Sequence, residues 1–289
     1  MTGRRYAPIF LICALLFGSA ALAVAQETVK LELKFKPGEL LRYKMVMNMN
    51  ISMEASGPST AQIPNLPMRM VMMMRQRTKR ILPNGSAQVN AVVDSMKLTM
   101  GTKTQDIPVN KMPCMTVVIS PSGRVESVTG LEKLTGVSNG MPFMNPWSMQ
   151  QYCGLPSNEL IVGESWSQSL PFPMGGNVSV IGTLVSASET LGKSKVAVVK
   201  QDIYGDLDFA NLAQSFSGQK VPIPSGLKMK GKINGSGTTY FSTEKGQMMR
   251  TDGWADLQMA LDVPASSQGG QSGSMSMKMR MDFEVFLLP

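Results

Sequence analysis

Methionine is the residue type in this chain whose spacing suggests chemistry. The sequence contains 26 methionines, and the stretches 45–53, 68–74 and 275–281 carry one at almost every second position. Thioether sulfur is a suitable ligand for copper(I). Methionine is also flexible and polarizable, so it suits surfaces that must fit varied apolar partners. A methionine-rich core and a sink for oxidants are the other interpretations.

The period of two predicts how these side chains are placed. Successive side chains on a strand point to opposite faces of a sheet, so methionines two positions apart share one face. Ordinary core residues lie in such rows, which weakens the copper(I) interpretation. A concave apolar surface that binds a lipid-like ligand has the same pattern. The residues that we predict to contact such a ligand are Met45, Met47, Met49, Met70, Met72, Met277 and Met279.

Signals for catalysis are weak or missing. The chain has no histidine, which removes Ser-His-Asp and Cys-His catalysis, most zinc and copper(II) sites, and an imidazole pH switch. The acidic residues at 202, 206 and 208 lack the spacing of an EF-hand. Ser225 and Lys228 match the S-x-x-K motif of penicillin-binding enzymes, but they follow two prolines and lead into a predicted strand. We therefore predict no enzyme activity, no metal site and no cofactor.

Two rows of basic residues also alternate along predicted strands. Arg75, Arg77 and Lys79 form one row, and the lysines at 228, 230 and 232 form the other. Such rows can hold an anionic headgroup or polymer. More often they are solvated faces that protect strands against edge-to-edge pairing, which is the interpretation we favour here.

Two cysteines, Cys114 and Cys153, follow the N-terminal segment that holds Cys13. Export places them where disulfides persist. We predict a bridge between them, which would close a loop of about 40 residues and contribute about 3–4 kcal/mol. Two buried free thiols are the alternative.

The chain is predicted to be mainly β. Residues 43–53 and 275–287 alternate apolar and polar side chains, as a half-buried antiparallel strand does. Glycine-tipped turns at 83–85, 121–123 and 244–246 separate neighbouring strands. The remaining predicted strands are 29–36, 68–81, 87–100, 115–120, 124–128, 178–187, 195–204, 228–242 and 247–262.

A weak internal repeat points to two similar halves. The segments 82–93 and 118–125 resemble 191–199 and 240–248, in the same order. We expect a large, twisted antiparallel sheet that forms an open or partial barrel, with halves at 26–155 and 156–289 or as one continuous domain. Short helices at 131–136 and 146–153 are predicted to cover an open edge or mouth. The segments 54–67 and 264–274 are predicted to be projecting loops.

The N-terminus has the layout of a secretory signal peptide. Arg4 and Arg5 precede an apolar run over 9–24, and small residues at 21–25 offer a cleavage site. The run is shorter than the roughly 20 residues of a transmembrane helix. No lipobox leads to a cysteine. We therefore predict a signal peptide at 1–25 and an exported protein, in the periplasm or outside the cell, without a lipid anchor, a later transmembrane segment or nucleic-acid partners.

Three segments resemble a family of secreted bacterial proteins of unknown function. They are 35–43 (FKPGELLRY), the VGESW segment at 162–166, and a G-x-G-x-x-x-F hairpin at 235–241. The resemblance implies an envelope protein with an antiparallel β fold and brings no catalytic residues. The same motifs have physical roles: Gly163 suits a positive φ, Trp166 anchors a strand, and the glycines at 235 and 237 permit close approach of strands.

The leading hypothesis is a non-catalytic, exported envelope protein that binds an apolar or amphipathic, lipid-like ligand on a methionine-rich sheet face. A structural module that binds an envelope protein through the loops at 54–67 and 264–274 is one alternative. A copper(I)-binding protein is the other.

Overall fold

The computed structural model describes residues 27–56, 62–112, 114–130, 154–171, 177–208, 228–263 and 273–289. The predicted signal peptide, the predicted helices at 131–136 and 146–153, and Cys153 lie outside these residues. The Ser225 motif lies outside them as well, except for Lys228.

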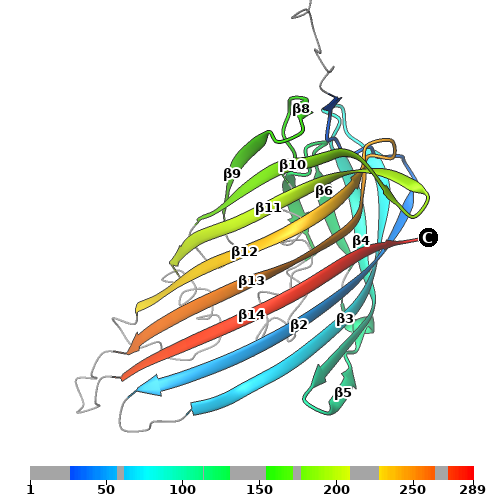
Figure 1. The fold of residues 1–289 in the computed structure, drawn as a ribbon. Coiled ribbons are helices and arrows are strands. Elements are labelled where there is room, and N and C mark those ends of the chain that lie inside the picture. The colour runs from blue at the N-terminus through cyan, green and yellow to red at the C-terminus, as the bar shows by residue number, and fades with distance from the viewer. Residues whose placement is uncertain are drawn as a thin grey trace, which may run out of the picture.

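One antiparallel sheet of 12 strands dominates the structure (Figure 1). Its order is β7-β6-β4-β3-β2-β14-β13-β12-β11-β10-β9, and β5 pairs with β4. β1 and β8 form a separate two-stranded sheet. The strands are β1 Thr28–Val29, β2 Leu40–Ser56, β3 Gln62–Ile81, β4 Ala87–Met100, β5 Lys103–Asp106, β6 Met115–Ile119, β7 Val125–Thr129, β8 Leu160–Ile161, β9 Ser165–Pro171, β10 Asn177–Leu191, β11 Ser194–Asp208, β12 Lys228–Ser242, β13 Gln247–Val263 and β14 Gly273–Leu288, and one 3-10 turn, η1, covers Val109–Lys111.

The predicted fold class is confirmed. The sheet curves strongly, so β4 and β6 lie behind β10 and β11 in Figure 1, but the described strands do not close into a barrel. In the strand order of this sheet, the strands from 26–155 are consecutive and so are the strands from 156–289. The two groups join where β2 pairs with β14. This long joint runs from Arg42, opposite Leu288, to Ser56, opposite Ser274.

The predicted strand at 29–36 is wrong except at its first residue. Only Thr28 and Val29 are in a strand, and they pair with β8. The following main-chain N–H groups donate to two separate turns, since Leu33 donates to the carbonyl of Pro121 and Lys34 to that of Gly246. An alternating sequence cannot reveal that its partners are turns rather than one neighbouring strand.

The two predicted loops are shorter than expected. β2 continues to Ser56 and β3 begins at Gln62, so both run into the segment 54–67 and pair there, with Glu54 opposite Gln62. β14 begins at Gly273. Main-chain pairing extends these hairpins through stretches whose Ser, Pro and Gly content predicts a loop. The structure also contains β5 and β8, which the sequence did not predict, whereas β9 is the strand expected to carry Trp166.

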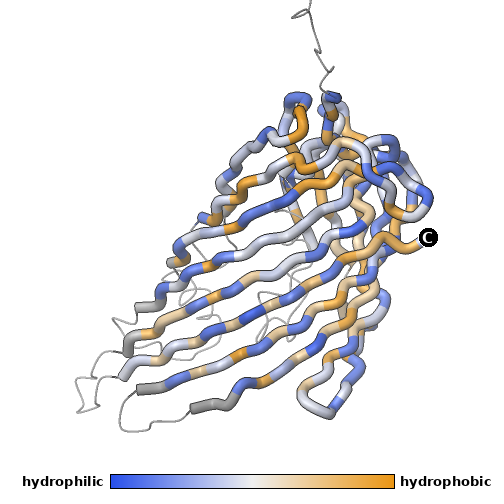
Figure 2. Tube along the Cα trace, viewed as in Figure 1, coloured by the Kyte–Doolittle hydropathy of each residue, from blue (hydrophilic) through white to orange (hydrophobic). Residues whose placement is uncertain are grey.

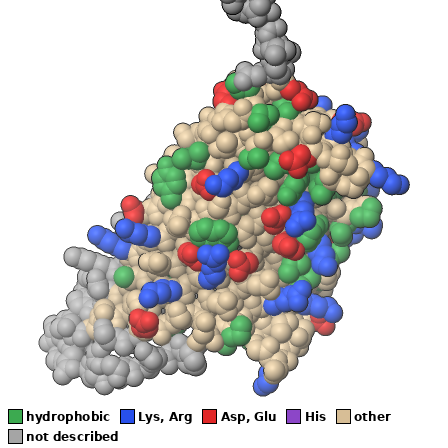
Figure 3. Space-filling model, viewed as in Figure 1, with side chains coloured by type: hydrophobic (Ala, Val, Ile, Leu, Met, Phe, Trp, Pro, Cys, Tyr) green, Lys and Arg blue, Asp and Glu red, His purple; other side chains and the backbone are tan. Residues whose placement is uncertain are grey.

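The curved sheet has an apolar inner face and a polar outer face. Hydropathy alternates along the strands in Figure 2, and charged side chains are spread over the outer face in Figure 3. On this outer face the Arg280 guanidinium lies 4.1 Å from the centre of the Trp254 ring and its Nη1 is 2.9 Å from Asp256 Oδ2. The core side chains of β2, β3, β4, β6 and β10–β14 form one cluster on the inner face.

The N-terminal segment caps one end of the curved sheet. Leu31 and Leu33 pack in a second apolar cluster with Leu155, Leu184 and Phe241. This cluster joins the segment to the ends of β10, β11 and β12. The carboxylate of Glu39 accepts a hydrogen bond from Gln247 Nε2 at 2.9 Å, which adds a polar link across the same end.

The glycine roles expected from the motifs are confirmed. Gly163 has φ +92° at the turn before β9. A Cβ on Gly235 would lie 2.6 Å from the Trp254 carbonyl oxygen, so the close approach of β12 and β13 needs glycine there. Trp166 is partly buried against the second cluster and donates from Nε1 to the Gly154 carbonyl at 2.9 Å.

Candidate functional site on the inner face

The predicted ligand-binding methionines lie together on one surface. We call this surface the methionine face, and we define it by the inward methionines of three adjacent strands. On β2 and β3, Met45 is opposite Met72 and Met47 is opposite Met70. The set comprises Met45, Met47, Met49, Met53, Met68, Met70, Met72, Met74, Met277, Met279 and Met281; Met275, in the same phase of β14, is 42% exposed and is not included.

β14 extends the methionine face on the other side of β2. Met281 is opposite Met49, and Met277 is opposite Met53. The third pair of this row, Met279 and Ile51, also places both side chains inward. All seven predicted ligand-contacting residues are therefore on a single face of three neighbouring strands, although residues 45 and 279 are far apart in the sequence.

The methionine face is packed. Met72 is 0 % exposed, Met70 is 1 % and Met47 is 2 %. Met279 is also buried, whereas Met277, nearer the end of β14, is half-buried. At a packed site of this kind, a ligand must move side chains. Methionine has three rotatable bonds and tolerates such rearrangement better than branched residues do.

A cavity of about 80 Å³ lies between the methionine face and the capped end. Strands from both halves of the chain line this cavity. Tyr43 and Val89 belong to one half, and Phe241 and Met248 belong to the other. The inner face is therefore concave at this level. The cavity itself has room for only a few water molecules.

Buried polar side chains also line this cavity. The row Met68–Met74 continues in the same phase with Gln76 and Thr78, which are 7 % and 5 % exposed. Gln201 and Thr239 face them from β11 and β12, also buried. The capped end of the interior thus places buried, uncharged polar side chains among its apolar lining, unlike the methionine face next to it.

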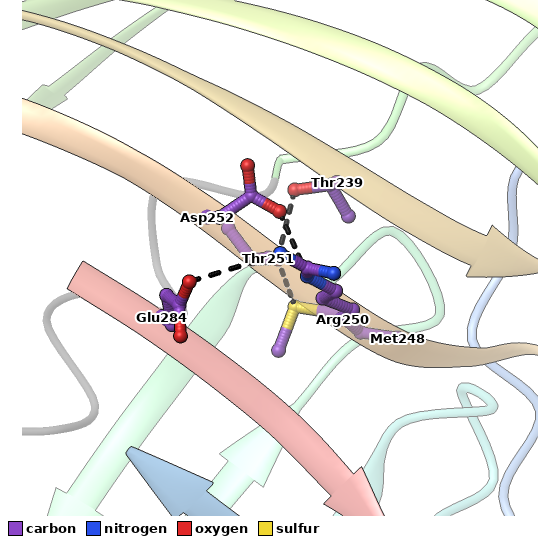
Figure 4. A network of polar contacts seen from close by, with 6 residues as sticks. All are labelled: Thr239, Met248, Arg250, Thr251, Asp252 and Glu284. Carbon is purple, nitrogen blue, oxygen red and sulfur yellow. Dashed lines mark hydrogen bonds and ion pairs between the residues drawn. The ribbon is translucent and has the colours of Figure 1, made fainter. Parts of the chain in front are cut away.

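A hydrogen-bond chain connects two of these polar groups, Gln201 and Thr239, to Thr251 and Met248, and Figure 4 shows the part from Thr239 to Met248. The Thr239 hydroxyl is 3.1 Å from Gln201 Oε1 and 2.9 Å from the hydroxyl of Thr251. Thr251 Oγ1 is also 2.9 Å from the sulfur of Met248. On the outer side of the same strand, Arg250 forms an ion pair with Asp252 at 2.9 Å. Sequence reasoning missed this inner polar chain, because its members come from strands that only the fold brings together.

One carboxyl group on the outer face has a shifted pKa. Ser236 Oγ donates to Asp202 Oδ1 at 2.7 Å, and this hydrogen bond lowers the pKa of Asp202 below its ordinary value. Partial burial acts in the opposite direction, and Lys200, with Nζ 3.1 Å from Oδ2, lowers the pKa further. Asp202, Asp206 and Asp208 all lie in β11, and the first two form ion pairs with Lys200 and Lys232.

Of the two cysteines in the predicted bridge, one is among the described residues. Cys114 is an exposed, free thiol just before β6. Its predicted partner, Cys153, lies outside the residues that the structure describes, so the bridge stays a prediction.

The described residues contain no group of three or more His, Cys, Asp or Glu side chains placed to hold a metal ion. Within the same residues, no helix has the length and hydropathy required to cross a membrane.

Comparison with known proteins leaves the chain without a family. No family model and no curated protein matches it. Three Pseudomonas aeruginosa crystal structures are similar at low level. OccK8 (OprE) is 6% identical with a TM-score of 0.20, covering 88% of this chain and 100% of that one. OpdQ is 6% identical with a TM-score of 0.19, covering 87% and 100%. OccK9 (OpdG) is 5% identical with a TM-score of 0.22, covering 86% and 99%. Similarity this low carries no conclusion about function, and the resemblance based on 35–43, 162–166 and 235–241 stays a prediction.

Proposed function

We propose that this chain is an exported, non-catalytic protein of the bacterial envelope that binds an apolar or amphipathic, lipid-like ligand on the methionine face. The observation that carries the proposal is the placement of eleven inward methionines on β2, β3 and β14 of a concave sheet. Flexible, polarizable side chains gathered on one concave face suit an apolar ligand of variable shape.

The charge distribution supports an apolar ligand inside the sheet. Inward side chains of 43–53, 68–78 and 277–287 include no charged residue. Charged residues on the same strands, such as Lys44, Arg75 and Arg280, point outward. Strands that span an outer membrane have the opposite arrangement, with an apolar band outside and polar residues inside. The pattern here favours a protein that keeps its apolar surface for a bound molecule.

The packed interior sets a condition on binding. A cavity of about 80 Å³ does not accept a long acyl chain, so ligand uptake requires the methionine side chains to repack. The need for repacking can be tested with substitutions that keep the protein folded but make the side chains less adaptable. Leucine has nearly the volume of methionine, so a Met→Leu change in a core usually costs less than about 1.5 kcal/mol. Because leucine is branched and has fewer rotatable bonds than methionine, its side chain rearranges less readily around a ligand.

The test compares leucine substitutions on the two faces of the sheet. One variant carries Met47→Leu on β2 and Met70→Leu and Met72→Leu on β3, all on the methionine face; the control carries Met73→Leu, which points outward on β3. Binding of a fluorescent fatty acid to delipidated mature protein is measured by titration. We expect the triple variant to remain folded and to bind several-fold more weakly, and the control to bind as the parent does. Equal affinity in all three proteins, or no binding by the parent, would contradict the proposal.

A further inference from the structure

The two basic rows lie on strands inside the sheet and on its outer face. β12 pairs with β11 and β13, and β3 pairs with β2 and β4. Protection against edge-to-edge pairing, the role favoured from the sequence, therefore does not apply to these rows. Arg75, Arg77, Lys230 and Lys232 are exposed, on the face opposite to the buried side chains of the same strands. These rows therefore bring no charge to the inner face.

The cavity at the capped end and the methionine face are on the same side of the sheet. Gln76 and Thr78 follow Met74 on β3 in the same phase, and both line the cavity. Tyr43, opposite Met74 on β2, lines it as well. Two residues along a strand span about 7 Å, so Gln76 lies directly beyond the methionine row. One ligand can occupy both parts of the inner face without crossing the sheet.

Four uncharged polar side chains from both halves of the chain line this cavity. We call them the polar pocket, and they are Gln76 and Thr78 of β3, Gln201 of β11 and Thr239 of β12. All four are buried. Each glutamine has a small residue beside it in the register, since Gln76 is opposite Ala91 and Gln201 is opposite Gly237. A glutamine amide offers two donors and an acceptor oxygen, so it can bond a ligand in addition to a protein partner.

The charges at this cavity cancel and are bonded within the cap. Among the described lining residues, Lys34 and Glu39 are the charged ones. Lys34 is exposed, and its Nζ donates to the carbonyls of Thr243 at 2.9 Å and Glu244 at 3.2 Å. The Glu39 carboxylate accepts the hydrogen bond from Gln247 Nε2. Burial of an ion without a partner of opposite charge costs far more than burial of a hydrogen-bonded hydroxyl or amide. The lining therefore favours an uncharged group.

We propose that the polar pocket binds the uncharged polar head of an amphipathic ligand, a hydroxyl, ester or amide group, while the chain of the ligand lies on the methionine face. The inference rests on the proposed function and adds the class of head. Gln76 and Thr78 contact the head from β3, and Gln201 and Thr239 contact it from β11 and β12. The cavity of about 80 Å³ holds a few water molecules, so the head is small and takes the place of water.

Three probes with the same oleyl chain separate the charge of the head from the contribution of the chain. Delipidated mature protein is titrated with oleyl alcohol, oleate and oleylamine, which carry no charge, a negative charge and a positive charge at pH 7. All three are used below the concentration at which they aggregate. The affinity is measured by displacement of a fluorescent fatty acid. The ranking of the probes on the parent protein requires no substitution.

Two variants test the polar pocket itself. The first carries Gln76→Met and Gln201→Met, which keep an unbranched side chain of similar length and remove the amides. The second carries Thr78→Val, which keeps the shape of the side chain and removes one hydroxyl. The matched control carries Gln105→Met and Gln258→Met, at exposed positions of β5 and β13. Urea denaturation shows which variants are folded before they are titrated.

We expect the parent and the control to bind oleyl alcohol about tenfold or more tightly than either ion, because the pocket offers neither ion a buried partner of opposite charge. The ions still bind through their chain. The double glutamine variant should bind the alcohol about tenfold more weakly, and Thr78→Val a few-fold more weakly, with the ions little changed.

Several results would overturn the polar pocket while leaving the proposed function in place. They are an ion bound as tightly as the alcohol by the parent, an equal loss in the control, unchanged alcohol binding by the folded variants, and an equal loss for all three probes, which a purely structural role of the glutamines would give. Failure of the parent to bind any of the three probes would instead contradict the proposed function.

Discussion

The main-chain N–H of Lys34 donates to the carbonyl of Gly246 at 3.1 Å. The preceding N–H, that of Leu33, donates to Pro121 at 2.7 Å. These acceptors are in the tips of the β12–β13 and β6–β7 hairpins, the two turns that correspond in the weak sequence repeat. One short segment thus holds the hairpin tips of both halves of the chain and closes one end of the interior.

Substitution of Gly246 by alanine should open this cap. Gly246 has φ +62°, where an alanine costs about 1–2 kcal/mol. Its Cβ would also collide with the Lys34 main chain, which adds about 1–3 kcal/mol if the segment moves. Gly192 is the matched control, because its φ is also +62° and a Cβ there meets nothing within 4 Å. Urea denaturation should show a markedly larger loss for Gly246→Ala than for Gly192→Ala; equal losses would mean that the Lys34 contact is not formed.

Truncation of a methionine on the inner face should destabilise the fold. Met47 is 2 % exposed, and a buried Met→Ala change costs about 2–5 kcal/mol through lost burial and the cavity that remains. Met100→Ala, at a side chain that is 42 % exposed, should change the unfolding free energy by less than about 0.5 kcal/mol. Unfolding free energies from urea titration check both values. A similar small effect at both positions would show that the methionine face is not packed as described.

The Ser236–Asp202 hydrogen bond predicts a pH effect of defined sign. Because the folded-state pKa of Asp202 is lowered, the stabilisation is present above the unfolded-state pKa and disappears as pH falls through the folded-state pKa. Ser236→Ala should therefore cost less than about 1 kcal/mol at pH 7, since the pair is partly exposed. The difference from the parent should shrink as pH falls below about 4. A difference that is constant from pH 7 to pH 2 would show that Asp202 is not its cause.

The Cys114–Cys153 bridge gives a mass prediction. Protein recovered from the cell envelope should be about two daltons lighter before reduction than after it, because disulfide formation removes two hydrogens. Cys114→Ser should abolish this difference. A mass that does not change on reduction would leave Cys114 as the free thiol seen at the start of β6.

Local sequence patterns predicted where most strands lie in the chain. They did not predict which strands are neighbours in the sheet and together form the candidate site. Alternation along 43–53 and 275–287 predicted two strands with their apolar sides on one face, and both are present. That β2 and β14 are neighbours depends on pairing between the two ends of the chain, which no local pattern encodes. The sequence did contain a signal for the polar side chains at the capped end. Gln76 and Thr78 continue the period-two row of Met68–Met74, so they were predictable as inward residues.

Native mass spectrometry of mature protein, recovered from the cell envelope without detergent, tests ligand binding by the methionine face most directly. We expect added mass of a lipid-like molecule that disappears on denaturation and is reduced in the Met47→Leu, Met70→Leu, Met72→Leu variant. Added mass of a copper ion would favour copper(I) binding instead. A bare polypeptide mass, from protein that also fails to take up oleate, would contradict the account.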